Sequence, residues 1–158
     1  MTLPGLQIRD FRSTDALDVI RLFYDTVHNV NARDYTSEQI DAWAPAIPDE
    51  PRWHDRLRAN FTYVAEANGQ MVGFSELRRD GYIETLYVHH QHQSMGIGSR
   101  LLSEMETRAR AVGARRLYTQ ASLTAYGFFQ RRGFKLVRAQ EVDLHGVQLR
   151  NFVMERPL

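Results

Sequence analysis

The sequence predicts a mixed α/β fold in which helices flank a mostly antiparallel sheet of about seven strands. The order of the periodic segments is strand, helices, three meandering strands, helix, strand, helix and two final strands. Asn68-Gly69 separates two apolar runs and is typical of a type I′ hairpin turn. A strand over 82–88, a helix starting near Gly96 and a strand over 116–121 form a unit whose two strands are normally parallel.

The first part of the chain predicts one strand followed by helices. Apolar residues over 6–11 indicate the strand, and Ser13-Thr14-Asp15 offers a helix cap before an apolar helical face that ends at Val27. Thr36 with Gln39 fits a capping box for a short helix through Trp43. A second short helix over 51–59 would bury Trp53 and Leu57. Both tryptophans are expected either to pack in the interior or to form walls of an acceptor site.

The rest of the chain follows the same logic of alternation, periodicity and turn residues. Gly113 and Gly133 are expected to end the two later helices. The remaining predicted elements are strands over 61–67, 70–78 and 82–88, a helix from the glycines to Val112, a strand over 116–121, a helix over 125–132, and strands over 134–142 and 147–154 joined at His145-Gly146.

Composition narrows the class of protein. A chain of 158 residues is expected to form one domain, 1–158, with a substantial core. Twenty basic and nineteen acidic side chains give a formal charge of +1, which argues against a large nucleic-acid interface. The absence of cysteine excludes disulfides, thiolate nucleophiles and cysteine-ligated zinc. No run is apolar enough for a membrane span, so we expect a cytoplasmic protein.

The loop between the strand over 82–88 and the following helix has the features of an anion site. The first N–H groups of a helix lack partners, and the helix dipole favours negative charge there. Gly96 and Gly98 carry no side chain where a phosphate would approach the backbone. A P-loop would require a lysine, and the dinucleotide fingerprint would require a glycine at position 101, which is Leu101.

The remaining pattern, Gln93-Ser94-Met95-Gly96-Ile97-Gly98, resembles the pyrophosphate loop of the GNAT acyltransferases, the acetyl-CoA-dependent N-acetyltransferase superfamily. The segment over 125–134, Ala-Tyr-Gly-Phe-Phe-Gln-Arg-Arg-Gly-Phe, resembles the Ala-x-x-Phe-Tyr-x-x-x-Gly-Phe segment of that superfamily. The resemblance covers nearly the whole chain. It implies a mixed sheet whose central strands splay open beside the pyrophosphate loop, with acetyl-CoA as acyl donor and no metal.

Amide formation from a thioester requires a base to deprotonate the amine. Glu84 is our candidate because it lies in the strand that leads to the loop, where acidic residues serve as bases in some family members. Glu76 in the adjacent strand is the reserve candidate, and a structural role for Glu84 is the alternative. Strict alternation places Glu84, Leu86 and Val88 on one face, unless a bulge changes the register.

The resemblance also implies how acetyl-CoA would be held. A backbone N–H near Val88 would polarise the thioester carbonyl, and main-chain groups of Leu86 and Val88 would pair with the pantetheine amides. Ser122 occupies a place where relatives often use a polar side chain on pantetheine. The full set of residues expected to bind the coenzyme is Leu86, Val88, Gln93, Ser94, Met95, Gly96, Ile97, Gly98, Ser99, Ser122 and Phe128.

The general acid is where the chain departs from the family pattern. Many relatives carry tyrosine second in the Phe-Tyr pair, and this chain has Phe129, which has no proton to donate. Tyr126 lies about one helical turn earlier and would be the substitute if it faces the cleft, or else a packing residue. A thiolate can also leave without a dedicated acid.

Other charged residues have simpler interpretations. The loop histidines His89, His90 and His92 lack acidic neighbours and are expected to be solvated. Arg131, Arg132 and Lys135 form a basic patch that would meet the coenzyme 3′-phosphate or solvent. The expected partners are acetyl-CoA and an amine acceptor, with the chain a monomer or homodimer. The competing hypothesis is a non-catalytic acyl-CoA-binding sensor or scaffold, which Phe129 alone favours.

Overall fold

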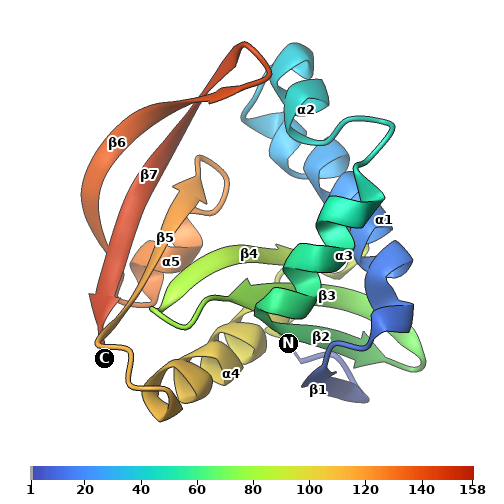
Figure 1. Cartoon of the computed structure of the whole chain (residues 1–158), viewed down its shortest axis with the longest axis vertical. Coiled ribbons are helices and arrows are strands. Elements are labelled where there is room, and N and C mark those ends of the chain that lie inside the picture. The colour runs from blue at the N-terminus through green and yellow to red at the C-terminus, as the bar shows by residue number, and fades with distance from the viewer. Residues whose placement is uncertain (1) are drawn as a thin grey trace.

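A seven-stranded sheet forms the centre of the molecule, with helices on both of its faces (Figure 1). The computed structural model describes residues 2–158. The strands are β1 (Leu6–Asp10), β2 (Phe61–Ala67), β3 (Gln70–Leu77), β4 (Tyr82–Val88), β5 (Arg116–Ser122), β6 (Lys135–Leu144) and β7 (Val147–Pro157), in the spatial order β1-β2-β3-β4-β5-β7-β6. All neighbouring strands are antiparallel except β4 and β5, which confirms the predicted mixed sheet.

The helices begin and end close to the predicted positions. They are α1 (Ala16–Asn29), α2 (Ser37–Trp43), α3 (Glu50–Ala59), α4 (Ile97–Ala111) and α5 (Tyr126–Arg131), with short 3-10 turns η1 (Ser13–Asp15), η2 (Asn31–Arg33) and η3 (His90–His92). The capping box of Thr36 and Gln39 is present. Asn68 and Gly69 have φ of 52° and 76°, as the predicted hairpin turn requires. Within residues 2–158, no helix is long and apolar enough to cross a membrane.

The start of α1 differs from the prediction. Residues 13–15 form η1 instead of capping α1 directly. The Asp15 carboxylate accepts the Arg12 N–H at 2.7 Å and two bonds from the Arg9 guanidinium at 2.8 and 2.9 Å. The Arg9 guanidinium therefore holds the pKa of Asp15 below its usual range, in spite of burial. The entry to α1 is fixed by this ion pair.

β4 and β5 pair only at their beginnings. Tyr82 lies opposite Tyr118 and Ile83 opposite Thr119, and pairing stops there. The Thr119 hydroxyl donates to the Ile83 carbonyl at 3.0 Å and closes this last pair. By contrast, β5 stays paired with β7 over its whole length. The later residues of β4 and β5 therefore diverge, and the sheet opens between them.

A bulge in β4 corrects the predicted alternation. Glu76 lies opposite Thr85 and Leu77 opposite Ile83, so Glu84 is an extra residue in β4. Ile83 consequently shares the core on the α4 side of the sheet with Leu86 and Val88. Glu84 does not share their face, because its carboxylate lies near Arg56 of α3 on the opposite side.

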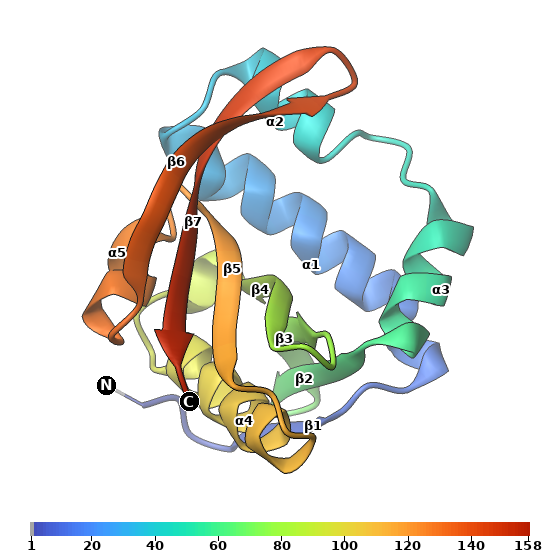
Figure 2. The same ribbon diagram turned by 60° about the vertical axis from the view of Figure 1, so that its left-hand side comes forward.

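The two faces of the sheet have different cores. Apolar residues of α4 and α5 fill one face, including Leu101, Met105 and Phe129. On the other face, α1 and α3 enclose an aromatic cluster in which Phe74 and Tyr87 stack with ring centroids 5.7 Å apart. Figure 2 shows α1 running across this second face, with α3 beside it. Rigid packing on both sides fixes β3 and β4 next to the opening.

Glu76 holds α3 against the sheet. Its side chain is fully buried, and its two oxygens accept bonds from the Arg56 guanidinium, each at 2.9 Å. The Thr85 hydroxyl donates to the same carboxylate at 2.7 Å, and the Asn60 amide does so at 3.3 Å. A buried carboxylate needs such partners, because desolvation otherwise opposes its charge. These bonds indicate a structural role for Glu76, which joins α3 to the sheet.

We expect Glu76→Gln to lower the free energy of unfolding by about 1.5–3 kcal/mol, the usual contribution of hydrogen bonds to a charged group. The Arg56 guanidinium would lose its nearest counter-ion while remaining only partly solvated, at 30% exposure. Urea titration measures the change. Glu155→Gln is the matched control, because Glu155 pairs with Arg116 at the surface and should contribute less than about 1 kcal/mol. Equal losses in the two variants would contradict the structural role of Glu76.

Candidate functional site

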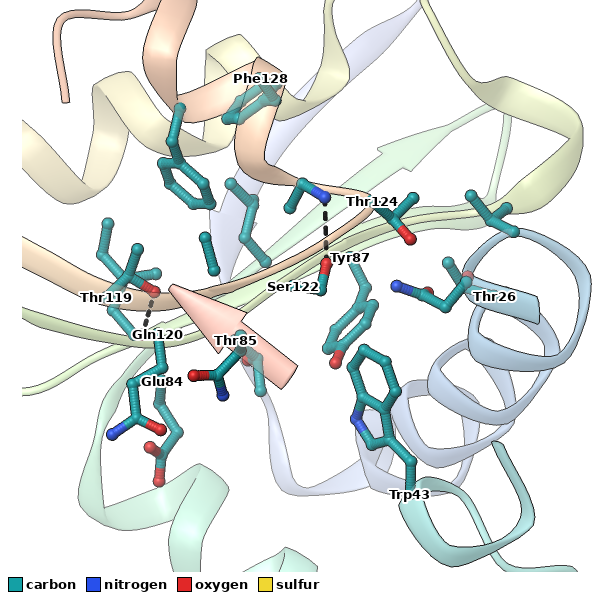
Figure 3. Close-up of a pocket in the computed structure, with 18 of the residues that line it drawn as sticks. Thr26, Trp43, Glu84, Thr85, Tyr87, Thr119, Gln120, Ser122, Thr124 and Phe128 are labelled. Atoms are coloured by element: carbon teal, nitrogen blue, oxygen red, sulfur yellow. Dashed lines mark hydrogen bonds between the residues drawn. The ribbon is translucent and has the colours of Figure 1, made fainter. Parts of the chain in front are cut away.

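The opening between β4 and β5 is a cavity of about 350 Å³. Its walls come from α1, α2, β4, β5, α5 and the β6–β7 hairpin (Figure 3). Seven of the residues singled out from the sequence lie in these walls: Glu84, Leu86, Val88, Gln93, Gly98, Ser122 and Phe128. The local motifs and the splayed sheet thus meet in one place.

The edge of β4 presents backbone groups to the cavity. His89 donates its N–H to the Val72 carbonyl of the neighbouring chain segment at 2.9 Å. Backbone groups alternate in direction along a strand, so those of Leu86 and Val88 point away from β3 and toward the opening. The Val88 carbonyl is occupied by the Thr26 hydroxyl at 3.2 Å and the Gln93 amide at 2.6 Å. The N–H groups of Leu86 and Val88 are left for a ligand.

Gly96 forms the N-terminal cap of α4 in a left-handed conformation, with φ of 80°. A Cβ added there would have no atom within 4 Å, so the space in front of the helix is open. The N–H groups of Ile97, Gly98 and Ser99 precede the first intrahelical bond, which Arg100 makes to the Gly96 carbonyl at 3.1 Å. This end of α4 can bind an anion.

Gly98 has a packing role that was not predicted. A Cβ at this position would lie 2.8 Å from Cε1 of Phe128, so the absence of a side chain accommodates the aromatic ring of α5. Gly98 therefore allows α5 to pack on the start of α4. The second glycine of the loop therefore makes room for the Phe128 ring, in addition to its predicted backbone contact with the coenzyme.

Arg132 connects the two sequence motifs. Its guanidinium lies 3.8 Å from the centre of the Phe128 ring, and its Nε donates to the Ser99 hydroxyl at 3.0 Å. Burial and the neighbouring charge of Arg131 lower the pKa of Arg132. No carboxylate in residues 2–158 forms an ion pair with it. A positive charge thus stands beside the N-terminus of α4, where both would attract an anion.

The two candidate carboxylates occupy different environments. Glu84 lines the cavity with its side chain 16% exposed, and its carboxylate accepts a bond from Arg78 at 2.9 Å. Arg56 is more distant, with 3.9 Å between its Nε and the Glu84 carboxylate. Glu76 does not form part of the cavity wall and is occupied by its structural partners. Of the two, Glu84 is the carboxylate that a bound acceptor would meet.

The structure does not place Tyr126 in the cavity. The Tyr126 ring packs against Phe152 with centroids 4.8 Å apart, at the edge of the core on the α4 side. Phe129 is buried in that core, at 4% exposure. The short helix α5 is turned so that Phe128 and Phe129 face the opening and Tyr126 faces β7. Ser122, in contrast, lines the cavity, where its hydroxyl accepts the Ala125 N–H at 3.0 Å.

Three tyrosines of the cavity wall were not predicted: Tyr35, Tyr82 and Tyr87. Burial raises the pKa of Tyr35 and of Tyr87, and raises that of Tyr82 to about 12. All three therefore remain protonated at neutral pH. The one feature of the sequence that could have indicated a tyrosine in the cavity wall is the position of Tyr87 between Leu86 and Val88. Trp43 also lines the cavity, whereas Trp53 packs against Phe23.

The loop histidines stack on one another instead of converging on a common point. The rings of His89 and His90 lie 4.5 Å apart, and His89 meets His92 edge to face at 5.3 Å. Burial, followed by the charges of His90 and His92, lowers the pKa of His89. In the described part of the chain, no group of three histidine, cysteine, aspartate or glutamate residues is arranged to hold a metal ion.

Comparison with known proteins agrees with this geometry. A family model described as an acetyltransferase (GNAT) domain matches residues 31–156. The chain belongs to the GNAT acetyltransferase family. An uncharacterized N-acetyltransferase of Escherichia coli, YafP, is 34% identical over 152 residues, which cover 96% of each chain. The predicted GNAT fold and acyltransferase class are thereby confirmed.

Solved structures of GNAT proteins superimpose closely on the chain. A GCN5-related N-acetyltransferase from Rhodopseudomonas palustris has a TM-score of 0.95 and 32% identity, covering 100% of this chain and 99% of that one. The PaiA N-acetyltransferase of Thermoplasma acidophilum, solved with coenzyme A, has a TM-score of 0.80 and 19% identity, covering 97% and 99%. At 19% identity, the similarity to the Thermoplasma acidophilum protein shows a shared fold and no more.

We expect Gly96→Glu to weaken coenzyme A binding about 10- to 100-fold, because a carboxylate would replace an anion at the N-terminus of α4. Gly113→Glu is a matched control at the other end of the same helix. Gly113 has φ of 83°, Gly96 has φ of 80°, and neither would bring a Cβ within 4 Å of another residue. Both variants carry the same backbone strain, so calorimetric affinities isolate the effect of the charge. Affinities within about threefold of each other would rule out an anion site at Gly96.

Proposed function

We propose that this GNAT protein transfers an acetyl group from acetyl-CoA to the primary amine of a small molecule or peptide, by direct attack in a ternary complex. The observation that carries the proposal is the position of Glu84. Its carboxylate opens into the same cavity as the unpaired N–H groups of Leu86 and Val88. A candidate base and hydrogen-bond donors therefore line the same space, where the two substrates would meet.

The acyl donor fits the remaining features of the site. The N-terminus of α4, with Ser99 and Arg132 beside it, suits the pyrophosphate. The open edge of β4 suits the pantetheine amides, which can pair with a strand as an added strand does. Ser122 and Phe128 flank the same passage. The coenzyme A bound to the Thermoplasma acidophilum relative supports this choice of donor.

Two groups of the protein would act on the reacting atoms. Glu84, directly or through water, takes a proton from the ammonium so that the nitrogen lone pair is free to attack the thioester carbonyl. An N–H of the β4 edge near Val88 stabilises the negative charge that develops on the carbonyl oxygen. As the new C–N bond forms, the C–S bond breaks and the thiolate leaves. The attacking nitrogen gives up its second proton to form the neutral amide, and the thiolate takes up a proton to give free coenzyme A.

The proposal is tested by incubating the protein with labelled acetyl-CoA and a panel of amines. Label in an N-acetylated product supports the transfer. Binding of acetyl-CoA without any acetylated product, across aliphatic, aromatic, polyamine and peptide acceptors, would instead favour a non-catalytic sensor. The same assay then serves to measure the variants below.

We expect Glu84→Gln to lower kcat about 10²–10⁴-fold, the usual contribution of a general base, while acetyl-CoA affinity stays near that of the wild type. Glutamine keeps the size and hydrogen bonding of the side chain but cannot accept the proton. Raising the pH should partly restore the rate, because more of the amine is then neutral in solution. Retention of more than about a third of the wild-type kcat near neutral pH would remove Glu84 as the base.

We expect Tyr126→Phe to leave kcat within about threefold of the wild type, because the hydroxyl lies outside the cavity wall and a thiolate leaves without a dedicated acid. Steady-state kinetics with the best amine of the panel provide the measurement. A loss of about 100-fold or more, at unchanged acetyl-CoA affinity, would restore Tyr126 as the general acid.

A further inference from the structure

The end of the cavity farthest from α4 is closed by contacts between segments distant in sequence. The Tyr35 hydroxyl donates to the Arg150 carbonyl at 2.7 Å and accepts the Leu123 N–H at 2.9 Å. The Gln39 amide donates to the Gln148 carbonyl at 2.9 Å. The chain after α1 is thereby joined to the β6–β7 hairpin, which arches over α2 in Figure 2.

The consequence of this closure is a limit on the size of the acceptor. A polypeptide would have to continue past the reacting amine, and the joined α2 and hairpin block that direction. A third bond, from the Thr124 hydroxyl to the Asp34 carboxylate at 2.7 Å, ties the chain between β5 and α5 to the same wall. The cavity is therefore suited to a small molecule that enters as a whole.

The closed end has a large apolar wall, beside the polar residues Asn31, Thr124 and Asn151. Aromatic rings of Trp43, Tyr35 and Tyr87 line it together with the aliphatic side chains of Val142, Leu144 and Leu149. In Figure 3, Trp43 rises from α2 next to the hydroxyl of Tyr87, whose pKa is raised by burial. Such walls bind the apolar body of a ligand through removal of its surface from water.

The carboxylate that lines the cavity lies at the other end. Glu84 is the only acidic residue in the cavity wall, within residues 2–158, and Figure 3 shows its carboxylate pointing away from Trp43. Arg150 is the only basic one in that range. Its side chain is 59% exposed and lies 4.0 Å from the Glu141 carboxylate. Arg150 contacts the closed end through its backbone carbonyl, which accepts the hydrogen bond from Tyr35.

The polar and apolar ends lie a short distance apart. Glu84 and Tyr87 are three residues apart in β4, which corresponds to about 10 Å along an extended strand. An amine held at Glu84 would therefore place a substituent of a few carbon atoms, or one aromatic ring, against Trp43 and Tyr87. A carboxylate on that substituent would be removed from water without a cationic partner, which is strongly unfavourable.

We propose that the acceptor is a small primary monoamine with an aromatic or branched aliphatic body and no carboxylate. The inference rests on the proposed acetyl transfer and adds the substrate class. The amine end is recognised by Glu84, and the apolar body is recognised by the wall around Trp43. Amino acids, peptide amines and polyamines with a second cation fit this cavity less well.

The first test uses the wild-type protein and two sets of acceptors. In a series of unbranched alkylamines, whose nitrogens have nearly the same basicity, kcat/KM should rise about fourfold for each added methylene until the cavity is filled. Phenethylamine and 4-(2-aminoethyl)benzoate differ by one carboxylate, at the far end of the ring, where it would meet the apolar wall. The benzoate should have a kcat/KM at least about 100-fold lower, because its carboxylate would be buried without a cationic partner.

The second test removes the apolar wall. Trp43→Ala should lower kcat/KM for phenethylamine at least about tenfold, chiefly through KM, and leave the value for ethylamine within about twofold. Leu136→Ala is the control, because it truncates an apolar side chain that is 48% exposed on β6 and outside the cavity wall. If Trp43→Ala does not fold, the wild-type series decides.

The outcomes separate this inference from the proposed function. Acetylation of the benzoate, a peptide or a polyamine with kcat/KM equal to that of phenethylamine would overturn the substrate class and leave acetyl transfer intact. A flat alkylamine series would do the same. The absence of any acetylated amine would overturn both proposals.

Discussion

The short pairing between β4 and β5 is the constraint on which the rest of the site depends. Only Tyr82 and Ile83 of β4 pair with β5, so the remaining edge of β4 has no neighbouring strand. Backbone groups cannot stay unpaired in a buried place without a large cost. The Thr26 hydroxyl and the Gln93 amide satisfy the Val88 carbonyl, and the cavity gives the nearby N–H groups access to a ligand. A bulge at Glu84 lies directly after the last pair, where it changes the register of the strand, and Glu84 lines the opening.

Packing around the helices keeps this opening in place. Phe128 fits against Gly98, and Arg132 stacks on that ring while it binds Ser99, so the start of α4 and the helix α5 form one unit. On the other face, Arg56 joins α3 to the buried Glu76. The same guanidinium lies near Glu84, which places a structural and a candidate catalytic carboxylate around one cation. Their environments differ, because only Glu84 lines the cavity.

Much of the fold follows from local patterns in the sequence. Alternation gave β4 its observed limits, Asn68-Gly69 marked a hairpin, and Thr36 with Gln39 marked the start of α2. These features depend on contacts within a few residues, so they can be predicted without the tertiary structure. The loop at Gly96 can be predicted for the same reason. Its left-handed cap, the strand before it and the helix after it are adjacent in the chain.

The sequence by itself therefore determined the order of the elements, the glycine loop before α4 and the family resemblance, since each is encoded in neighbouring residues. The tertiary structure alone decided that Glu84 is a bulged residue, that Glu76 is buried beneath Arg56, and that Tyr126 packs on Phe152. It also decided that Tyr35 joins α2 to the β6–β7 hairpin and closes the cavity. The physical reason is that register, helix rotation and burial are set by contacts between residues far apart in the chain, and no local periodicity records those contacts.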